Sequence, residues 1–207
     1  MFANRLQAGG LLAEKLPEFR KMKDCAVLGI PRGGVLVAAE VSKSLGLPLS
    51  LMVVRKIGAM LNPELAVGAI GMDGRPYFNT EVASQTGATK EYLQSEAERQ
   101  YGEVKRRMGF FRIKEGTFRG KTIILVDDGI ATGSTVLAAI RILRGQKVRR
   151  LVLAVPVCSA DTAQVLKPLV DRFVCLEIPP SFSAVGQFYS DFAQVADSDV
   201  KRIMDGR

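Results

Sequence analysis

The sequence predicts an α/β fold: a doubly wound, mainly parallel five-stranded sheet with a small lobe that forms a hood and a lid. Short apolar runs rich in β-branched residues alternate with helical patterns, which is the chain order of a parallel sheet covered by helices. The 207 residues allow one sizeable core and a small appended lobe, because two full domains would be cramped. The expected strands are residues 25–30, 49–54, 123–126, 151–155 and 172–176.

We expect a single domain over residues 1–207. Its core takes about residues 22–56 and 80–178, its lid about residues 57–79, and its hood residues 1–21 and 179–207. Helices are expected at 35–45, from 134 and from 160, and also at 80–86 and 89–112. The helix at 89–112 carries an apolar stripe, which we interpret as core-facing scaffold and not as a cofactor site. The stripe consists of Tyr92, Ala97, Tyr101, Val104 and Met108.

The chain is basic, with a formal net charge of +8 from 29 Lys and Arg against 21 Asp and Glu. A basic surface attracts polyanions, and both phosphorylated small molecules and nucleic acid qualify. Much of the excess lies at residues 105–107, 112, 114 and 141–150, on expected helices and their ends. A solvated helical face is the favoured interpretation. Because no nucleic-acid-binding motif is present, we expect no nucleic-acid partner.

The hydropathy pattern predicts neither a membrane span nor a secretory signal. The longest apolar run, residues 151–158, is far too short to cross a bilayer. Near the N-terminus, the apolar stretch 9–13 is broken by Glu14 and Lys15. We therefore expect a cytoplasmic protein without a membrane partner.

The cysteine and histidine content narrows the chemistry. Cys25, Cys158 and Cys175 lie within or at the ends of apolar runs, so buried free thiols are favoured over reactive or metal-binding ones. The chain has no histidine. This excludes Ser-His-Asp and Cys-His catalysis and the usual zinc sites.

The most informative stretch is residues 122–135. The apolar strand 123–126 ends in Asp127 and Asp128, and a loop of small residues then opens a helix. Such a loop offers N–H donors, hydroxyls and the positive end of the helix dipole, which together suit a phosphate. The loop residues are Gly129, Ile130, Ala131, Thr132, Gly133, Ser134 and Thr135.

The two acids cannot hold that phosphate. They would accept hydrogen bonds from vicinal hydroxyls or hold a hydrated Mg²⁺. A phosphate with a diol beside it describes a ribose 5-phosphate. The P-loop of nucleotide triphosphatases fits poorly because no Lys follows Gly133, and no G-x-G-x-x-G dinucleotide fingerprint is present.

Two further segments suit anions. Pro31, Arg32, Gly33 and Gly34 connect the strand 25–30 to a helix, so that a glycine pair with an adjacent Arg meets the start of the helix. Arg55 and Lys56 follow the expected strand 49–54. We expect all three anion-handling segments at the carboxyl ends of parallel strands, where open α/β folds bind ligands.

Residues 123–135 resemble the 5-phosphoribosyl-1-pyrophosphate (PRPP) motif of type I phosphoribosyltransferases. The string 62–66 with Gly68 and Ala69, and the tail after residue 176, also resemble an uncharacterised bacterial branch of that family. The resemblance implies transfer of ribose 5-phosphate from PRPP to a nitrogen acceptor, with Mg²⁺ and release of pyrophosphate. It further implies a lid at 57–79 and makes a homodimer plausible.

The resemblance also assigns roles. Asp127, Asp128, Lys56 and Arg32 would be catalytic, with both acids near Mg²⁺ only through water or ligand. The loop from Gly129 to Thr135 would hold the 5-phosphate. Pyrophosphate would lie against Pro31, Arg32, Gly33, Gly34, Arg55 and Lys56.

The acceptor is less defined. Glu64 is a candidate acid, base or substrate contact, although a solvated loop carboxylate explains it equally well. Phe182, Phe188 and Tyr189 are candidates for stacking on the acceptor. The 6-oxopurine branch carries an acid where this chain has Ala131, which disfavours hypoxanthine or guanine. Two other functions stay open: a non-catalytic PRPP or nucleotide sensor, and a hydrolase of phosphoribosyl compounds.

Overall fold

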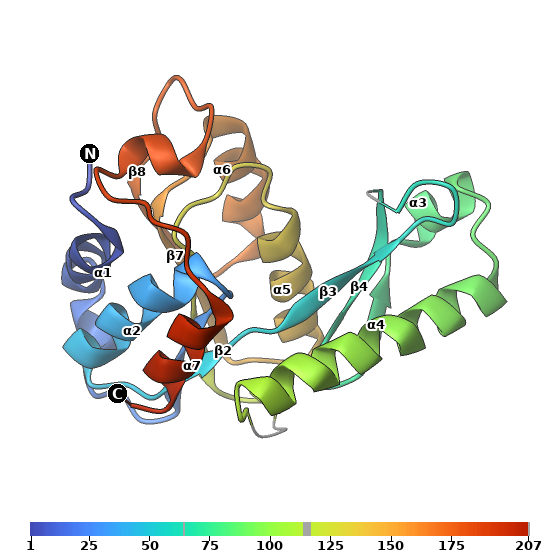
Figure 1. Cartoon of the computed structure of the whole chain (residues 1–207), viewed down its shortest axis with the longest axis horizontal. Helices are drawn as coiled ribbons and strands as arrows, with labels where there is room; N and C mark the ends of the chain where they lie inside the picture. Colours follow the sequence, from blue (N-terminus) through green and yellow to red (C-terminus); the bar gives the residue numbers. More distant parts are fainter. Residues whose placement is uncertain (64, 114–116, 207) are drawn as a thin grey trace.

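The computed structural model of the chain describes residues 1–63, 65–113 and 117–206 (Figure 1). Its main sheet is parallel and five-stranded, with the strand order β2-β1-β6-β7-β8, as predicted. The strands are β1 (Cys25–Gly29), β2 (Leu49–Leu51), β6 (Thr122–Val126), β7 (Arg150–Val157) and β8 (Arg172–Glu177).

Helices cover both faces of this sheet because its strands are apolar on both sides. Leu28, Ile123 and Leu125 pack against α5, whereas Val27 and Ile124 pack against α1 and α2. The helices of this part are α1 (Arg5–Glu14), α2 (Gly33–Leu45), α5 (Ser134–Gly145), α6 (Ala160–Leu166) and α7 (Asp197–Met204). Three short 3-10 turns complete it: η1 (Pro17–Phe19), η2 (Lys167–Leu169) and η3 (Val185–Phe188).

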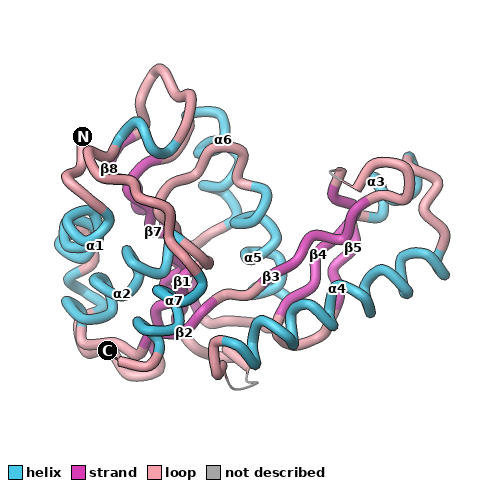
Figure 2. Tube along the Cα trace, viewed as in Figure 1, coloured by secondary structure: helices cyan, strands magenta, loops and turns pink. Residues whose placement is uncertain are grey.

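A smaller lobe projects from the main body (Figures 1 and 2). It contains an antiparallel sheet of the order β3-β4-β5, crossed by a long helix. Its elements are β3 (Val54–Gly58), β4 (Ala66–Gly71), β5 (Pro76–Phe78), α3 (Thr80–Gln85) and α4 (Lys90–Phe110). The lobe is thus larger than the segment 57–79 predicted as a lid, because α4 packs mainly on β3 and β4.

The prediction of one continuous strand at 49–54 is wrong, because two strands of different sheets share this segment. The chain leaves the main sheet after Leu51, and Val54 begins antiparallel pairing with Gly71. Arg55 and Lys56 therefore lie inside β3 of the small lobe, opposite Ile70 and Ala69, and not at the end of a main-sheet strand. A continuous apolar run does not reveal where a chain passes from one sheet to another.

The hood consists here of residues 1–5 and the tail 179–193, whereas the rest of α1, also predicted as hood, packs on α2 and the main sheet. The Phe2 N–H donates to the Phe188 carbonyl oxygen at 2.7 Å, and the Ser190 N–H donates to the Phe2 carbonyl oxygen at 2.8 Å. The rings of Phe2 and Tyr189 lie 5.4 Å apart. These contacts join the first residues to the tail beyond β8.

The three cysteines are free thiols. Cys25 and Cys158 are buried, and Cys175 is half-buried. Burial raises the pKa of Cys25 and of Cys158 to about 11, and that of Cys175 to about 12. A raised pKa keeps a thiol protonated and unreactive, in agreement with the structural role predicted for all three.

Across the described ranges, no helix combines the length and the apolar character needed to cross a membrane.

Candidate functional site

The acidic pair lies beside the glycine pair because the strands that precede them are neighbours. β1 and β6 pair in parallel, with Gly29 opposite Val126. The Ile30 N–H then donates to the Val126 carbonyl oxygen at 2.9 Å. The segments that follow the two strands therefore leave the sheet at the same edge, where ligands of open α/β folds bind.

Gly33 and Gly34 let the backbone touch the two carboxylates. A Cβ atom at Gly34 would lie 2.7 Å from Oδ1 of Asp127, and one at Gly33 would overlap Oδ2 of Asp128. Atoms this close leave no room for a side chain, so glycine is required by the approach of the acids. The sequence pointed to this pair as an anion loop but gave no sign that the acids pack against it.

Hydroxyls from α6 and the residue before it fix the loop after the acids. The Ile130 carbonyl oxygen accepts the Ser159 N–H at 3.0 Å. The Ala131 carbonyl oxygen accepts Ser159 Oγ at 2.9 Å and Thr162 Oγ1 at 2.6 Å. With these two carbonyl groups bound by partners outside it, the loop is held in place.

The same loop opens α5 in a form that suits a phosphate. Gly133 has a φ of 71°, in the left-handed region, and a Cβ there would lie 2.6 Å from Cγ2 of Thr162. No side chain in the described ranges caps α5, so its first N–H groups are available to a ligand. Thr132, Ser134 and Thr135 are exposed at this point. Residues 129–136 line a hollow of about 190 Å³ together with Asp127 and Val185.

A second hollow, of about 180 Å³, lies next to the first and is rich in cations. Its lining includes Pro31, Arg55, Lys56, Arg107 and Thr135. Because Thr135 lines both hollows, the two are adjacent. The Arg55 Nε donates to Gln100 Oε1 at 2.9 Å, which holds that guanidinium against α4.

Of the predicted pyrophosphate ligands, the structure thus brings Pro31, Arg55 and Lys56 together in the second hollow. Arg32 is exposed at the N-cap of α2, outside the residues that line this hollow. The peptide bond between Pro31 and Arg32 is cis.

The two acids have different partners. The Asp128 N–H donates to Asp127 Oδ1 at 2.9 Å, and Arg5 Nε donates to Asp128 Oδ2 at 2.7 Å. Burial raises the pKa of Asp127 well above its ordinary range, and the negative charge of Asp128 adds to the rise. Asp127 therefore takes up a proton more readily than an exposed carboxyl group would.

Tyr189 supports the acid loop. The side chain is 6 % exposed, and its hydroxyl donates to the Asp128 carbonyl oxygen at 2.6 Å. Its ring lies 5.0 Å from that of Phe192 and also packs on Phe2. Burial raises the pKa of its hydroxyl, and the negative charge of Asp128 adds to the rise, so it stays a hydrogen-bond donor. Tyr189 thus supports Asp128 through its hydroxyl, and its predicted stacking on the acceptor stays a prediction.

The other two predicted acceptor contacts, Phe182 and Phe188, come before Tyr189 in the tail. Phe182 and Phe188 are half-buried, with ring centroids 5.3 Å apart. Val185, between them, packs on Gly129 and reaches the phosphate-sized hollow. Glu64 lies outside the described residues.

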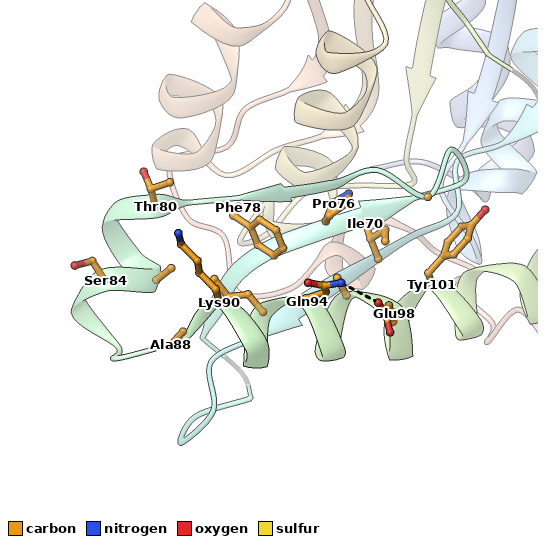
Figure 3. Close-up of a pocket in the computed structure, with 14 residues that line it drawn as sticks. Ile70, Pro76, Phe78, Thr80, Ser84, Ala88, Lys90, Gln94, Glu98 and Tyr101 are labelled. Atoms are coloured by element: carbon orange, nitrogen blue, oxygen red, sulfur yellow. Dashed lines mark hydrogen bonds between the residues drawn. The ribbon is translucent and has the colours of Figure 1, made fainter.

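A third and larger hollow, of about 720 Å³, lies in the small lobe between the sheet and α3 and α4 (Figure 3). Its walls are largely apolar, with Ile70, Pro76 and Phe78 on the sheet side and Lys90 and Gln94 on α4. It contains none of the residues of the acid pair, the glycine pair or the loop before α5. The stripe predicted as scaffold on this helix borders it through Ala97 and Tyr101, whereas Val104 and Met108 are buried in the core of the lobe.

Sequence reasoning missed several residues of the site. Arg107 reaches the cationic hollow from a helix predicted as scaffold, and Arg5 reaches Asp128 from the N-terminal helix. Ser159 and Thr162 bind the loop from the start of a helix that follows the next strand, and the sequence around them carries no motif. Each belongs to an element remote in sequence from the motif it supports, and no local pattern distinguishes such a residue from an ordinary surface group.

Comparisons with known proteins agree with this geometry. The family model described as "Phosphoribosyl transferase domain" matches residues 4–193. Two Mycobacterium tuberculosis proteins, from strains H37Rv and CDC 1551 and provisionally named phosphoribosyl transferases, are each 41% identical over 209 residues. The match covers 99% of this chain and 46% of each relative, so the chain spans about half the length of these relatives.

A solved structure is similar over nearly the whole chain. The crystal structure of TT1426 from Thermus thermophilus has a TM-score of 0.87 and 40% sequence identity, and the match covers 98% of this chain and 97% of that one. The chain belongs to the phosphoribosyl transferase domain family.

Proposed function

We propose that this chain transfers ribose 5-phosphate from PRPP to a nitrogen acceptor and releases pyrophosphate. One observation carries the proposal: a phosphate-sized hollow and a cation-lined hollow meet at Thr135. PRPP carries a phosphate at one end and a pyrophosphate on the adjoining ribose, so its two anionic groups match the two hollows.

The chemistry follows from where charge develops. As the bond between the ribose and pyrophosphate breaks, positive charge grows on the ribose and negative charge on the leaving group. Lys56, Arg107 and the exposed Arg32 would stabilise the pyrophosphate, and the Asp127–Asp128 pair would orient the ribose hydroxyls and offset its charge. No covalent intermediate is needed, which is consistent with a chain that has no histidine to activate a nucleophile.

The acidic pair also fits Mg²⁺. Within the described ranges, no three His, Cys, Asp or Glu side chains are grouped to hold a metal ion. Mg²⁺ usually needs only one or two carboxylates, because substrate phosphates and water supply the other ligands. Asp127 and Asp128 would hold it through water or ligand, and the bound ion would neutralise charge on the pyrophosphate.

The nature of the acceptor follows less directly. Ala131 is exposed in the loop, where the 6-oxopurine branch carries an acid, so adenine, a pyrimidine or another nitrogen base fits better than hypoxanthine or guanine. Phe182 and Phe188 remain candidates to stack on it. The homodimer and the cytoplasmic location stay predictions from the sequence.

The test is pyrophosphate release from PRPP and Mg²⁺ with a panel of purine, pyrimidine and pyridine acceptors and a control without acceptor. We expect release that depends on both Mg²⁺ and one class of acceptor. Release without acceptor would indicate hydrolysis instead. Tight PRPP binding in calorimetry without any release would indicate a sensor.

Replacing Asp128 by Asn should leave the fold intact and lower turnover with PRPP by about 100-fold or more, because an oriented negative charge at the ribose is lost. Steady-state kinetics measures the effect, and circular dichroism checks the fold. Asp171→Asn is the matched control. Asp171 lies away from the site and forms an ion pair with Arg144, with 3.0 Å between Oδ2 and Nη1. An unchanged rate in Asp128→Asn would refute this assignment.

Replacing Gly33 by Ala should weaken productive PRPP binding. The added methyl group would overlap Oδ2 of Asp128, and a displacement of about 1 Å in such a site lowers the rate by about 100-fold. The control is Gly102→Ala in α4, where a Cβ meets nothing within 4 Å. Equal kcat/KM values for the two variants would show that the glycine pair does not serve the substrate.

Replacing Arg107 by Met should weaken inhibition by the product pyrophosphate. A hydrogen bond to a charged group contributes about 1.5 to 3 kcal/mol, so we expect the inhibition constant to rise by about 10-fold or more. Arg106→Met is the control, because Arg106 is exposed on the same helix and pairs with Glu103 at 3.0 Å. Equal inhibition constants would remove Arg107 from the pyrophosphate site.

A further inference from the structure

We infer that Arg5 is a positioning residue that orients Asp128 for the ribose of PRPP. The inference rests on the proposed function, since it assigns to α1 a part in the same site. The sequence motif for PRPP, residues 123–135, lies far from α1 along the chain. The residues around Arg5 carry no motif that marks it as part of a site.

Arg5 is buried at the first turn of α1, and its head group contacts both the acid loop and the tail. Its Nε donates to Asp128 Oδ2 at 2.7 Å, and its Nη1 donates to the Ala193 carbonyl oxygen at 2.9 Å. The Arg5 guanidinium carbon lies 3.8 Å from the ring centroid of Phe192, a cation–π contact. The side chains of Arg5 and Asp128 are 9% and 15% exposed.

The start of α1 is itself fixed, so Arg5 is held by its backbone as well as its head group. The Asn4 side chain accepts the Gln7 N–H at 3.0 Å and caps the helix. The Gln7 side chain in turn accepts the Ala3 N–H at 2.6 Å. This reciprocal capping sets the direction in which the Arg5 side chain leaves the helix.

Asp128 is thereby held at three points, of which two come from the hood. Arg5 binds one carboxylate oxygen, Tyr189 binds the backbone carbonyl group at 2.6 Å, and the N–H of Asp128 itself is bound by Asp127. We assign the ribose hydroxyl to the carboxylate oxygen that Arg5 does not bind, Oδ1. A carboxylate already fixed in this way loses little rotamer freedom when the sugar binds, which favours the bound geometry.

Arg5 also touches the other loop of the site. A Cβ at Gly33 would lie 3.0 Å from Arg5 Nε. The guanidinium group thus lies where the glycine pair and the acid pair meet. A merely structural ion pair could lie anywhere on the surface of the fold. This one lies between the segments that would hold the two ends of the reacting bond.

The test compares Arg5→Met and Arg5→Lys with the wild-type chain, in kinetics of PRPP-dependent pyrophosphate release and in PRPP binding by calorimetry. We expect kcat/KM for PRPP to fall by about 100-fold in Arg5→Met, the loss that misplacement of a reacting group by about 1 Å brings. Arg5→Lys keeps the charge without the planar fork and should recover part of the loss. Should Arg5→Met fail to fold, Arg5→Lys carries the comparison alone.

Two measurements separate positioning from stability. Arg144→Met is the matched control: it removes an ion pair of the main body, Arg144 with Asp171, and should lower the melting temperature without changing kcat/KM. A double variant supplies the second. If Arg5 acts through Asp128, adding Arg5→Met to Asp128→Asn should cause little further loss, because a shared interaction is not additive.

The outcomes are distinct. A kcat/KM and a PRPP affinity for Arg5→Met within twofold of wild type, measured well below its melting temperature, would overturn the inference, as would full additivity with Asp128→Asn. If the wild type binds PRPP without turning it over, the calorimetric affinities decide. If the wild type neither binds PRPP nor releases pyrophosphate, the proposed function fails first and this inference fails with it.

Discussion

The lateral pairing of β1 with β6 is the interaction on which the candidate site depends. It runs in register from Cys25 opposite Thr122 to Gly29 opposite Val126. Parallel strands in register end level with each other, so the segments that follow them emerge side by side. A shift of one residue would separate Gly34 from Asp127, whose carboxylate now packs against its backbone. Close packing on both faces of the sheet favours this register, because a slip would remove the buried side chains from the helices they pack against.

Around that edge, three parts of the molecule contribute different chemistry. The main sheet delivers the acids and the loop that opens α5. The small lobe adds cations from β3 and α4, and the hood adds Arg5 and Tyr189 as supports for Asp128. Charge is distributed accordingly: carboxylates lie at the centre, with positive groups on two sides. Such an arrangement suits a ligand whose phosphates lie outward and whose sugar lies inward.

The sequence predicted the main sheet and the central motif because both are written in consecutive residues. An apolar strand, two acids and a glycine-rich helix start are contiguous from 123 to 135, and each has one structural meaning at that spacing. The prediction of a strand at 49–54 was wrong because Leu51 and Val54 are both apolar strand residues, although they belong to different sheets. The sequence does not predict the site roles of Arg5, Arg107 and Thr162 for a related reason. These roles arise from tertiary contacts, which produce no periodicity or spacing in the sequence. Tyr189 was noticed, but only its buried hydroxyl bond reveals what it holds.

The hood has a consequence for how the site comes into being. Arg5 is separated along the chain from Asp128 by 123 positions and from Ala193 by 188. Contacts of such long range close only after the intervening chain has been ordered, and they form late in folding. During synthesis Arg5 leaves the ribosome before both Asp128 and Ala193, so its contacts can form only after those residues have been made. The main sheet, from β1 to β8, can assemble earlier, before Arg5 binds the carboxylate of Asp128. The site is therefore complete only when the hood has formed and Arg5 and Tyr189 bind Asp128.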